Sequence, residues 1–177
     1  MTWKSFHSRG EVLRTVITEA DARRDGHLPM HVEGVAETFR DELTLLGALT
    51  LRWHTRLAGR IERELSTQPM DLEGAVIDAW RATAEELPGV LAILDHHRAE
   101  PLDDAMATAM TTSAAKEHVL LAVMAGRSSG GDAHAVHAVQ AGKMIAERAR
   151  AGQSLQVPAT RAPISLVDRL RAVLHAA

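Results

Sequence analysis

The sequence predicts an all-α fold, a single-domain bundle of six or seven helices wrapped on one long central helix. Apolar residues recur three or four positions apart through most of the chain, the spacing that places them on one face of a helix. Aspartate, serine, glycine and proline stand between these segments, where helices begin and end. No stretch alternates apolar and polar residues convincingly enough to predict a strand.

The central helix is predicted over residues 35–65. Its main buried seam is formed by residues at helical spacing: Phe39, Leu43, Leu46, Thr50, Trp53, Leu57, Ile61 and Leu65. A second set widens the apolar surface around the middle of the helix: Leu45, Leu49 and Leu51. Residues 43–51 are then apolar almost all round, so we expect cover on several sides, from the chain itself or from a second copy. Gly47 or Gly59 is expected to mark a bend or a close contact.

The same signals place the remaining helices. They are predicted over residues 10–24, 71–87, 90–98, 103–126, 132–151 and 165–175. Their predicted N-caps are Ser8, Asp71, Asp103 or Asp104, Asp132 and Ser165. Residues 90–98 form either a new short helix or the preceding helix after a kink, because proline at position 88 is tolerated in a first turn. Residues 153–163 are predicted to be a polar linker before the C-terminal helix 165–175.

Length and composition limit the class of protein. A chain of 177 residues, 46% of them apolar, is long enough to bury a core as one domain, residues 1–177. The absence of cysteine excludes disulfides, thiolate nucleophiles and zinc sites built on sulfur. No signal peptide or membrane span is apparent, so the sequence predicts a soluble cytoplasmic protein. The excess of arginine over lysine and the many alanines predict a bacterial source with a GC-rich genome.

Charge divides unevenly along the chain. Residues 1–126 hold 13 Lys and Arg against 20 Asp and Glu, and residues 127–177 hold 7 against 3. We interpret this as a basic C-terminal part that packs on an acidic body. Basic residues diluted among Ala, Gly and Pro make a poor phosphate-binding surface, and an aromatic content of 3% supplies few stacking platforms. Nucleic acid is therefore not an expected partner.

Ten histidines suggest a metal site. A carboxylate-bridged dimetal bundle needs Glu-x-x-His pairs, which the sequence lacks. His96 and His97 stand four and three residues before Glu100, and His134 stands three residues before His137. Each set could offer two ligands from one helix face to zinc or iron, with a third ligand from a neighbouring helix. The alternative is a solvated helix end for the first set, where imidazolium favours the helix dipole, and a plain surface role for the second.

Two short motifs resemble enzyme signatures. Asp95-His96-His97, after an apolar run, resembles the signature of DHH phosphoesterases, which implies metal binding at the end of a strand in a parallel sheet. Residues 126–130, Gly-Arg-Ser-Ser-Gly, fit the G-x-S-x-G nucleophile pattern, which needs a strand before the serine and a helix after it. The predicted fold supplies no sheet for either motif. We therefore interpret the first as part of a helix and the second as a connecting loop, which could also bind an anion.

The sequence identifies no substrate, cofactor or catalytic residue. The favoured hypothesis is a non-enzymatic interaction or small-ligand-binding module that self-associates, as a homodimer that covers the apolar middle of the central helix. The alternative is a metal-dependent helical-bundle enzyme that uses His96, His97 and Glu100, or His134 and His137, as ligands.

Overall fold

The computed structural model describes residues 3–129 and 135–155. Helices form most of this part of the chain, and it contains no strand. The helices are α1 (Trp3–Arg23), α2 (Val35–Phe39), α3 (Glu42–Thr67), α4 (Leu72–Glu86), α5 (Pro88–Ala99), α6 (Asp104–Met124) and α7 (Ala135–Leu155). The predicted all-α fold is confirmed, and no helix within the described ranges is long and apolar enough to cross a membrane.

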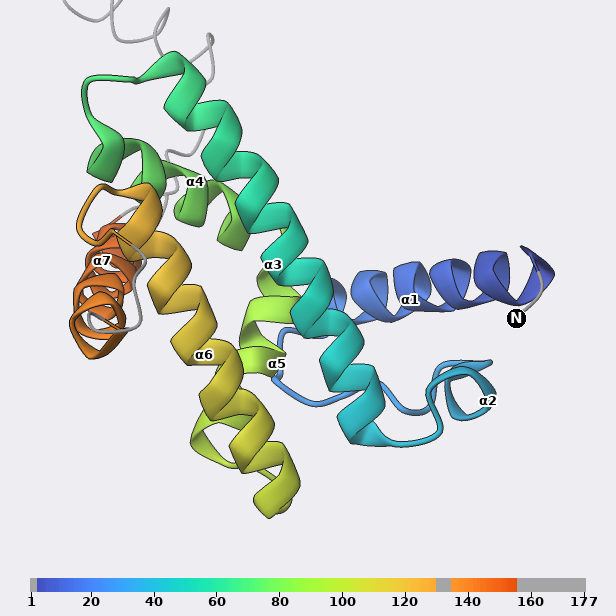
Figure 1. Ribbon diagram of the computed structural model, residues 1–177. Helices are drawn as coiled ribbons and strands as arrows, with labels where there is room; N and C mark the ends of the chain where they lie inside the picture. Colours follow the sequence, from blue (N-terminus) through green and yellow to red (C-terminus); the bar gives the residue numbers. More distant parts are fainter. Residues whose placement is uncertain (1–2, 130–134, 156–177) are drawn as a thin grey trace, which may run out of the picture.

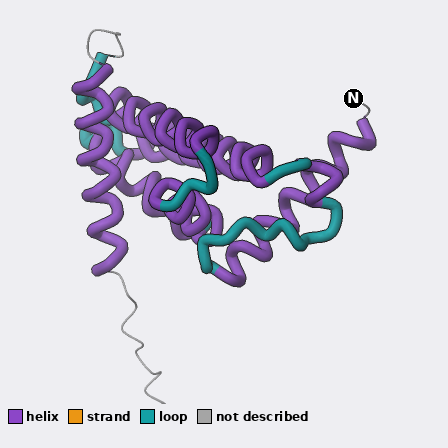
Figure 2. The backbone as a smooth tube through the Cα atoms, turned by 90° about the horizontal axis from the view of Figure 1, so that it is seen from below, coloured by secondary structure: helices purple, strands orange, loops and turns teal. Residues whose placement is uncertain are grey.

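Helix α3 runs through the middle of the molecule (Figure 1). Helices α4, α5 and α6 pack against it, α7 packs on α6 and α4, and α1 and α2 lie beside its N-terminal half. The most extensive contacts join α6 to α7, α3 to α4, and α1 to α5. The N-terminal half of α1 extends away from the body formed by α3 to α7, which is visible from two directions (Figures 1 and 2). Helix α1 therefore borders α3 over only a short length.

The predicted central helix is interrupted at Arg40, so the prediction of one helix over residues 35–65 is wrong at its N-terminal end. Arg40 adopts a left-handed φ of 62°, and Asp41 is extended with φ of −140°. The Asp41 carboxylate accepts a hydrogen bond from the backbone N–H of Thr44 at 2.7 Å and thereby caps α3. Phe39, which was predicted to lie on the seam of the central helix, is buried but belongs to α2.

Local capping explains most of the other helix boundaries. Asp71 and Asp103 cap α4 and α6 as predicted, by accepting from the N–H of Gly74 at 2.9 Å and of Met106 at 2.7 Å. Pro88 begins a separate helix, α5, which decides between the two alternatives for residues 90–98. The prediction of Ser8 as an N-cap is wrong, because α1 already begins at Trp3.

At the other end of the chain, α7 continues to Leu155, beyond the predicted end near residue 151 and into the predicted linker 153–163. The predicted cap Asp132, the rest of that linker and the predicted helix 165–175 lie outside the described residues. The expected packing of a basic C-terminal part on the body is tested only by residues up to 155, among which Arg148 and Arg150 do pair with acidic residues of α4 and α5.

The core is built from α3 and its neighbours. Leu46, Trp53, Leu57 and Ile61 of the predicted seam are buried, and so are Leu45 and Leu49 of the second set. Trp53 meets Trp80 of α4 edge to face, with ring centroids 5.8 Å apart. Burial of each such side chain contributes about 1.5–3 kcal/mol relative to leaving it in water. Leu51, by contrast, keeps 67% of its surface exposed.

Close helix contacts occur at Gly89 and Gly142, and not at the predicted Gly47 or Gly59. A Cβ added at Gly142 would overlap the backbone carbonyl of His118, so the missing side chain lets α7 approach α6. At Gly89 an added Cβ would overlap the backbone of Ala20 in α1. A Cβ at Gly47 or Gly59 would meet no described residue within 4 Å, so neither glycine is needed for a close contact in this part of the chain.

Candidate functional site

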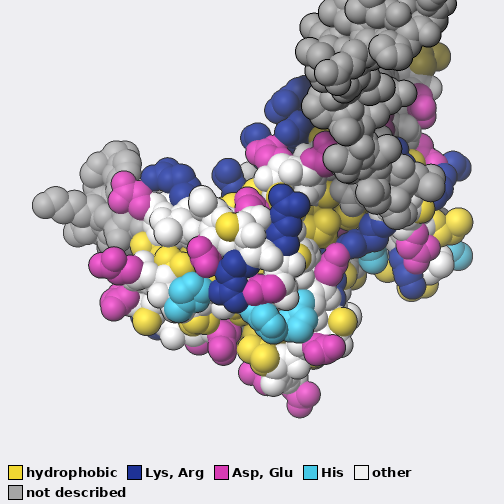
Figure 3. Space-filling model, turned by 180° about the vertical axis from the view of Figure 1, so that it is seen from behind, with side chains coloured by type: hydrophobic (Ala, Val, Ile, Leu, Met, Phe, Trp, Pro, Cys, Tyr) yellow, Lys and Arg dark blue, Asp and Glu magenta, His cyan; other side chains and the backbone are white. Residues whose placement is uncertain are grey.

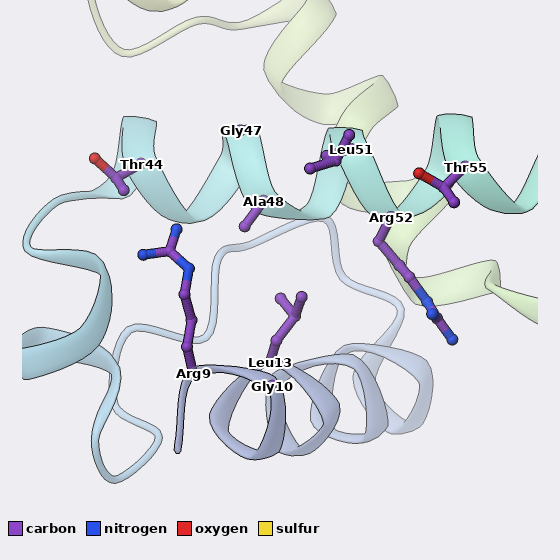
Figure 4. Close-up of a pocket in the computed structure, with 9 residues that line it drawn as sticks. All are labelled: Arg9, Gly10, Leu13, Thr44, Gly47, Ala48, Leu51, Arg52 and Thr55. Carbon is purple, nitrogen blue, oxygen red and sulfur yellow. The ribbon is translucent and has the colours of Figure 1, made fainter. Parts of the chain in front are cut away.

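An open pocket of about 480 Å³ lies between α1 and α3 (Figure 4). Its α1 wall is formed by Arg9, Gly10 and Leu13, and its α3 wall by Thr44, Gly47, Ala48, Leu51, Arg52 and Thr55. Sites for small molecules usually measure about 300–1,000 Å³ and are mostly apolar, with a few polar groups that orient the ligand. The α1–α3 pocket matches this description in size and in lining.

The sequence of α3 explains why the pocket forms. Leu45 and Leu49 point into the core, while Gly47, Ala48 and Leu51 lie on the side of the helix that faces α1. Glycine and alanine take up little space, so a hollow remains between the two backbones. Residues 43–51, which were predicted to be apolar almost all round, are thus covered by their own chain on one side and left open on the other.

The two ends of the pocket carry positive charge. In Figure 4 the side chain of Arg9 reaches from α1 toward Thr44, and that of Arg52 extends from α3 on the far side of Leu13. The Arg9 guanidinium lies 4.7 Å from the centroid of the Phe39 ring and donates to the Thr38 carbonyl at 3.4 Å. Arg52 is exposed and makes no hydrogen bond or ion pair within the described ranges. Among the residues that the structure describes, no acidic residue lines the pocket.

A second polar site lies inside the bundle, around the buried carboxylate of Glu117. The indole N–H groups of Trp53 and Trp80 each donate to this carboxylate at 3.2 Å. Arg98 donates to it at 3.0 Å, and Nε2 of His54 lies 3.5 Å away. Donors from α3, α4 and α5 thus converge on one side chain of α6, so the burial of its charge is compensated.

Helix α7 joins this network through Asp95. Arg150 donates to the Asp95 carboxylate at 2.6 and 2.8 Å, and Asp95 also accepts from Arg98 at 3.2 Å. The Arg150 guanidinium lies 4.9 Å from the centroid of the Trp80 ring. Asp95, Arg98 and Arg150 line a surface pocket of about 210 Å³. Each of the two arginines already has a carboxylate partner. We therefore interpret the network as structural.

The environment of Glu117 predicts acid sensitivity. Burial raises the pKa of this carboxyl, but the close approach of His54, the charge of Arg98 and the hydrogen bond from Trp80 outweigh burial and lower the pKa to about 2, from an ordinary 4.5. The pKa of Glu117 is lower in the folded protein than in the unfolded chain, so the ionised carboxylate stabilises the folded state. This contribution is complete above pH 4.5 and is lost as the pH falls toward 2. We expect a loss of about 3 kcal/mol over this interval from this group, at 1.36 kcal/mol per pKa unit.

Urea unfolding at pH 7, 5, 4 and 3 measures the part of this loss that occurs above pH 3, about 2 kcal/mol. The Glu117→Gln variant, which cannot ionise, should start less stable and lose less stability than wild type between pH 5 and 3. The matched control is Glu147→Gln, because the Glu147 side chain is 62% exposed. Equal losses in wild type and Glu117→Gln would contradict the assignment.

The three residues predicted to bind metal at the end of α5 differ in burial and in partners. His97 is buried and its Nδ1 lies 2.9 Å from the Ile93 carbonyl, whereas Glu100 is the exposed C-cap residue. His96 meets the rings of His27 and His97 edge to face, at centroid distances of 5.1 and 5.0 Å. Burial is the main cause that lowers the pKa of His97. Histidine side chains gather in patches on the rear face (Figure 3).

Of the second predicted pair, His137 is exposed at the start of α7 and lines a pocket with residues 126–129. His134 lies outside the described residues. Within the described ranges, no group of three histidine or acidic side chains is arranged to hold a metal ion. The metal-dependent alternative stays a prediction, and elemental analysis of the purified protein, with the His96→Ala/His97→Ala double variant, would test it.

Sequence reasoning missed both sites described above. Glu117 could have been noticed, because it is an acidic residue in the middle of the apolar face of α6. For the α1–α3 pocket, the apolar residues 43–51 indicated a surface that needs cover, but the second wall depends on how α1 and α3 cross and had no local signal. Neither a family model, nor a curated protein, nor a solved structure matches this chain, so the geometry alone indicates what these sites do.

Proposed function

We propose that the protein is a non-enzymatic binding module that takes a small, largely apolar ligand into the α1–α3 pocket. The single observation that supports this proposal is the pocket itself, which measures about 480 Å³ and has the exposed Leu51 in its apolar central part. An exposed leucine is common, but one at the centre of an apolar hollow marks a surface that a ligand would remove from water.

Self-association is the second part of the proposal. The α1–α3 pocket is open on the side away from the core, and a second copy of the chain that covers this side would bury Leu51. Sedimentation at micromolar concentration distinguishes a dimer from a monomer. A monomer at these concentrations would remove self-association from the proposal and leave ligand binding in place.

Leu51→Glu tests ligand binding at this pocket. We expect the neutral apolar dye Nile red to bind the wild type and to bind Leu51→Glu at least about tenfold more weakly, because a carboxylate replaces apolar surface at the centre of the site. Fluorescence titration gives both affinities. The side chain is exposed, so the substitution should leave the fold intact, which circular dichroism checks.

The matched control is Leu102→Glu, at another exposed leucine that does not line the pocket. It should bind the dye as wild type does. Equal affinities for wild type, Leu51→Glu and Leu102→Glu would show that the dye binds elsewhere, and a failure of the wild type to bind it would contradict an apolar site.

A further inference from the structure

We propose that the ligand of the α1–α3 pocket is a free single-chain amphiphile with a carboxylate head, whose alkyl chain lies over Leu13, Ala48 and Leu51 and whose head pairs with Arg52. This inference rests on the proposed function, because it names the chemical class that the same pocket would select. Its support comes from three features of the pocket: its shape, its charge and the partners of its two arginines.

The shape suits a narrow chain. The α3 wall runs from Thr44 to Thr55, which corresponds to roughly 16 Å of helix at 1.5 Å per residue. The middle of this wall is apolar and small, with Leu13 of α1 opposite it, while the polar groups stand toward the ends (Figure 4). An elongated hollow with an apolar middle and polar ends fits an alkyl chain with one polar head better than a compact, evenly polar molecule.

The charge of the pocket selects an anion. Of the described residues, Arg9 and Arg52 line the pocket and no Asp or Glu does. Residues 1–126 as a whole nevertheless carry an excess of acidic residues, 20 against 13. Two uncompensated guanidinium groups at the ends of an apolar hollow would attract an anionic head and repel a cationic one. A guanidinium group binds a carboxylate with two parallel N–H···O hydrogen bonds, so one arginine can hold such a head group in a fixed orientation.

The partners of the two arginines distinguish their roles. Arg9 already contacts the Phe39 ring and the Thr38 carbonyl, so part of its donor capacity is used. Arg52 has no hydrogen bond or ion pair within the part of the chain that the structure describes, so its fork of donors is available. We therefore assign the head group to Arg52 and a supporting electrostatic role to Arg9.

A free ligand fits these observations better than a membrane surface. Recognition of anionic lipid surfaces uses clusters of about four to eight basic residues, whereas this pocket offers two. The pocket is also a hollow and not a convex apolar face. The proposal is therefore limited to a monomeric amphiphile in solution.

Isothermal titration calorimetry with dodecanoate and its neutral analogue dodecanol, both below their aggregation limits, tests this inference. Wild type should bind dodecanoate about threefold to fivefold more tightly than dodecanol, because an ion pair with an exposed arginine contributes up to about 1 kcal/mol. Arg52→Gln should reduce the dodecanoate affinity to that of dodecanol and leave dodecanol binding unchanged. The control Arg63→Gln, at an exposed arginine of α3 outside the pocket, should change neither affinity.

The outcomes separate this inference from the proposed function. Equal binding of dodecanoate and dodecanol by wild type, both lost in Leu51→Glu, would overturn the carboxylate assignment and retain an apolar site. Dodecanoate binding that survives Leu51→Glu, or that Arg52→Gln does not weaken, would also overturn it. If wild type binds neither compound nor Nile red, both the inference and the proposed function are wrong.

Discussion

Glu117→Ala is expected to lower the free energy of unfolding by about 3–5 kcal/mol, a large share of the stability of a domain this size. The substitution removes the acceptor on which two indole N–H groups and Arg98 converge. Arg98 would keep its charge with only Asp95 beside it, and the indole groups would be left without a partner in the core. Urea unfolding at pH 7 measures the change.

The control for this prediction is Glu147→Ala, whose side chain is 62% exposed and forms a long ion pair of 4.0 Å with Lys143. We expect a change within about 0.5 kcal/mol for this variant. If Glu117→Ala were as stable as Glu147→Ala, the convergence of donors on Glu117 would not hold in solution.

Trp53→Ala is expected to have a similar effect, about 3–5 kcal/mol, for a different reason. Trp53 is fully buried on α3, and its removal leaves a cavity beside Trp80 that the surrounding helices can fill only in part. Thermal unfolding followed by circular dichroism, together with urea unfolding, measures the loss.

Trp53→Phe separates packing from hydrogen bonding, because phenylalanine retains much of the buried surface but lacks the N–H that Glu117 accepts. We expect a loss smaller than that of Trp53→Ala. Since Trp53 and Glu117 are in contact, the double variant Trp53→Ala/Glu117→Ala should lose less than the sum of the two single losses. A purely additive double variant would contradict the network.

Local sequence signals predicted the helices well. Asp71 acts within its own turn, so the residues next to it were enough to place the start of α4. The local signals around Pro88 and Asp103 located α5 and α6 but left two alternatives for each start, which the structure decides. Asp41 also caps a helix within its own turn. Its neighbours continue the apolar spacing of the central helix, so the sequence pattern predicted one uninterrupted helix there. The break at Arg40 was missed for this reason.

Local sequence signals could not predict how the Glu117 network and the α1–α3 pocket are assembled. Glu117 meets Trp80 and Trp53 from 37 and 64 positions away along the chain, and the α1–α3 pocket joins residues that are also far apart in sequence. Spacing predicted that His96 and Glu100 share a helix face. Glu100 is instead the C-cap residue of α5, and its backbone, with φ of −132° and ψ of 72°, is not helical.

The Glu117 network also has a consequence for how stability is distributed over the molecule. Its members come from α3, α4, α5, α6 and α7, whereas α1 is tied to α5 by the Asp21 carboxylate, which accepts from the N–H of Gly89 at 2.8 Å. We expect α1 and α2 to open as a cooperative unit of lower stability than the five remaining helices. The α1–α3 pocket lies at the boundary of these two units, so an occupant would join them and slow the amide hydrogen exchange of α1.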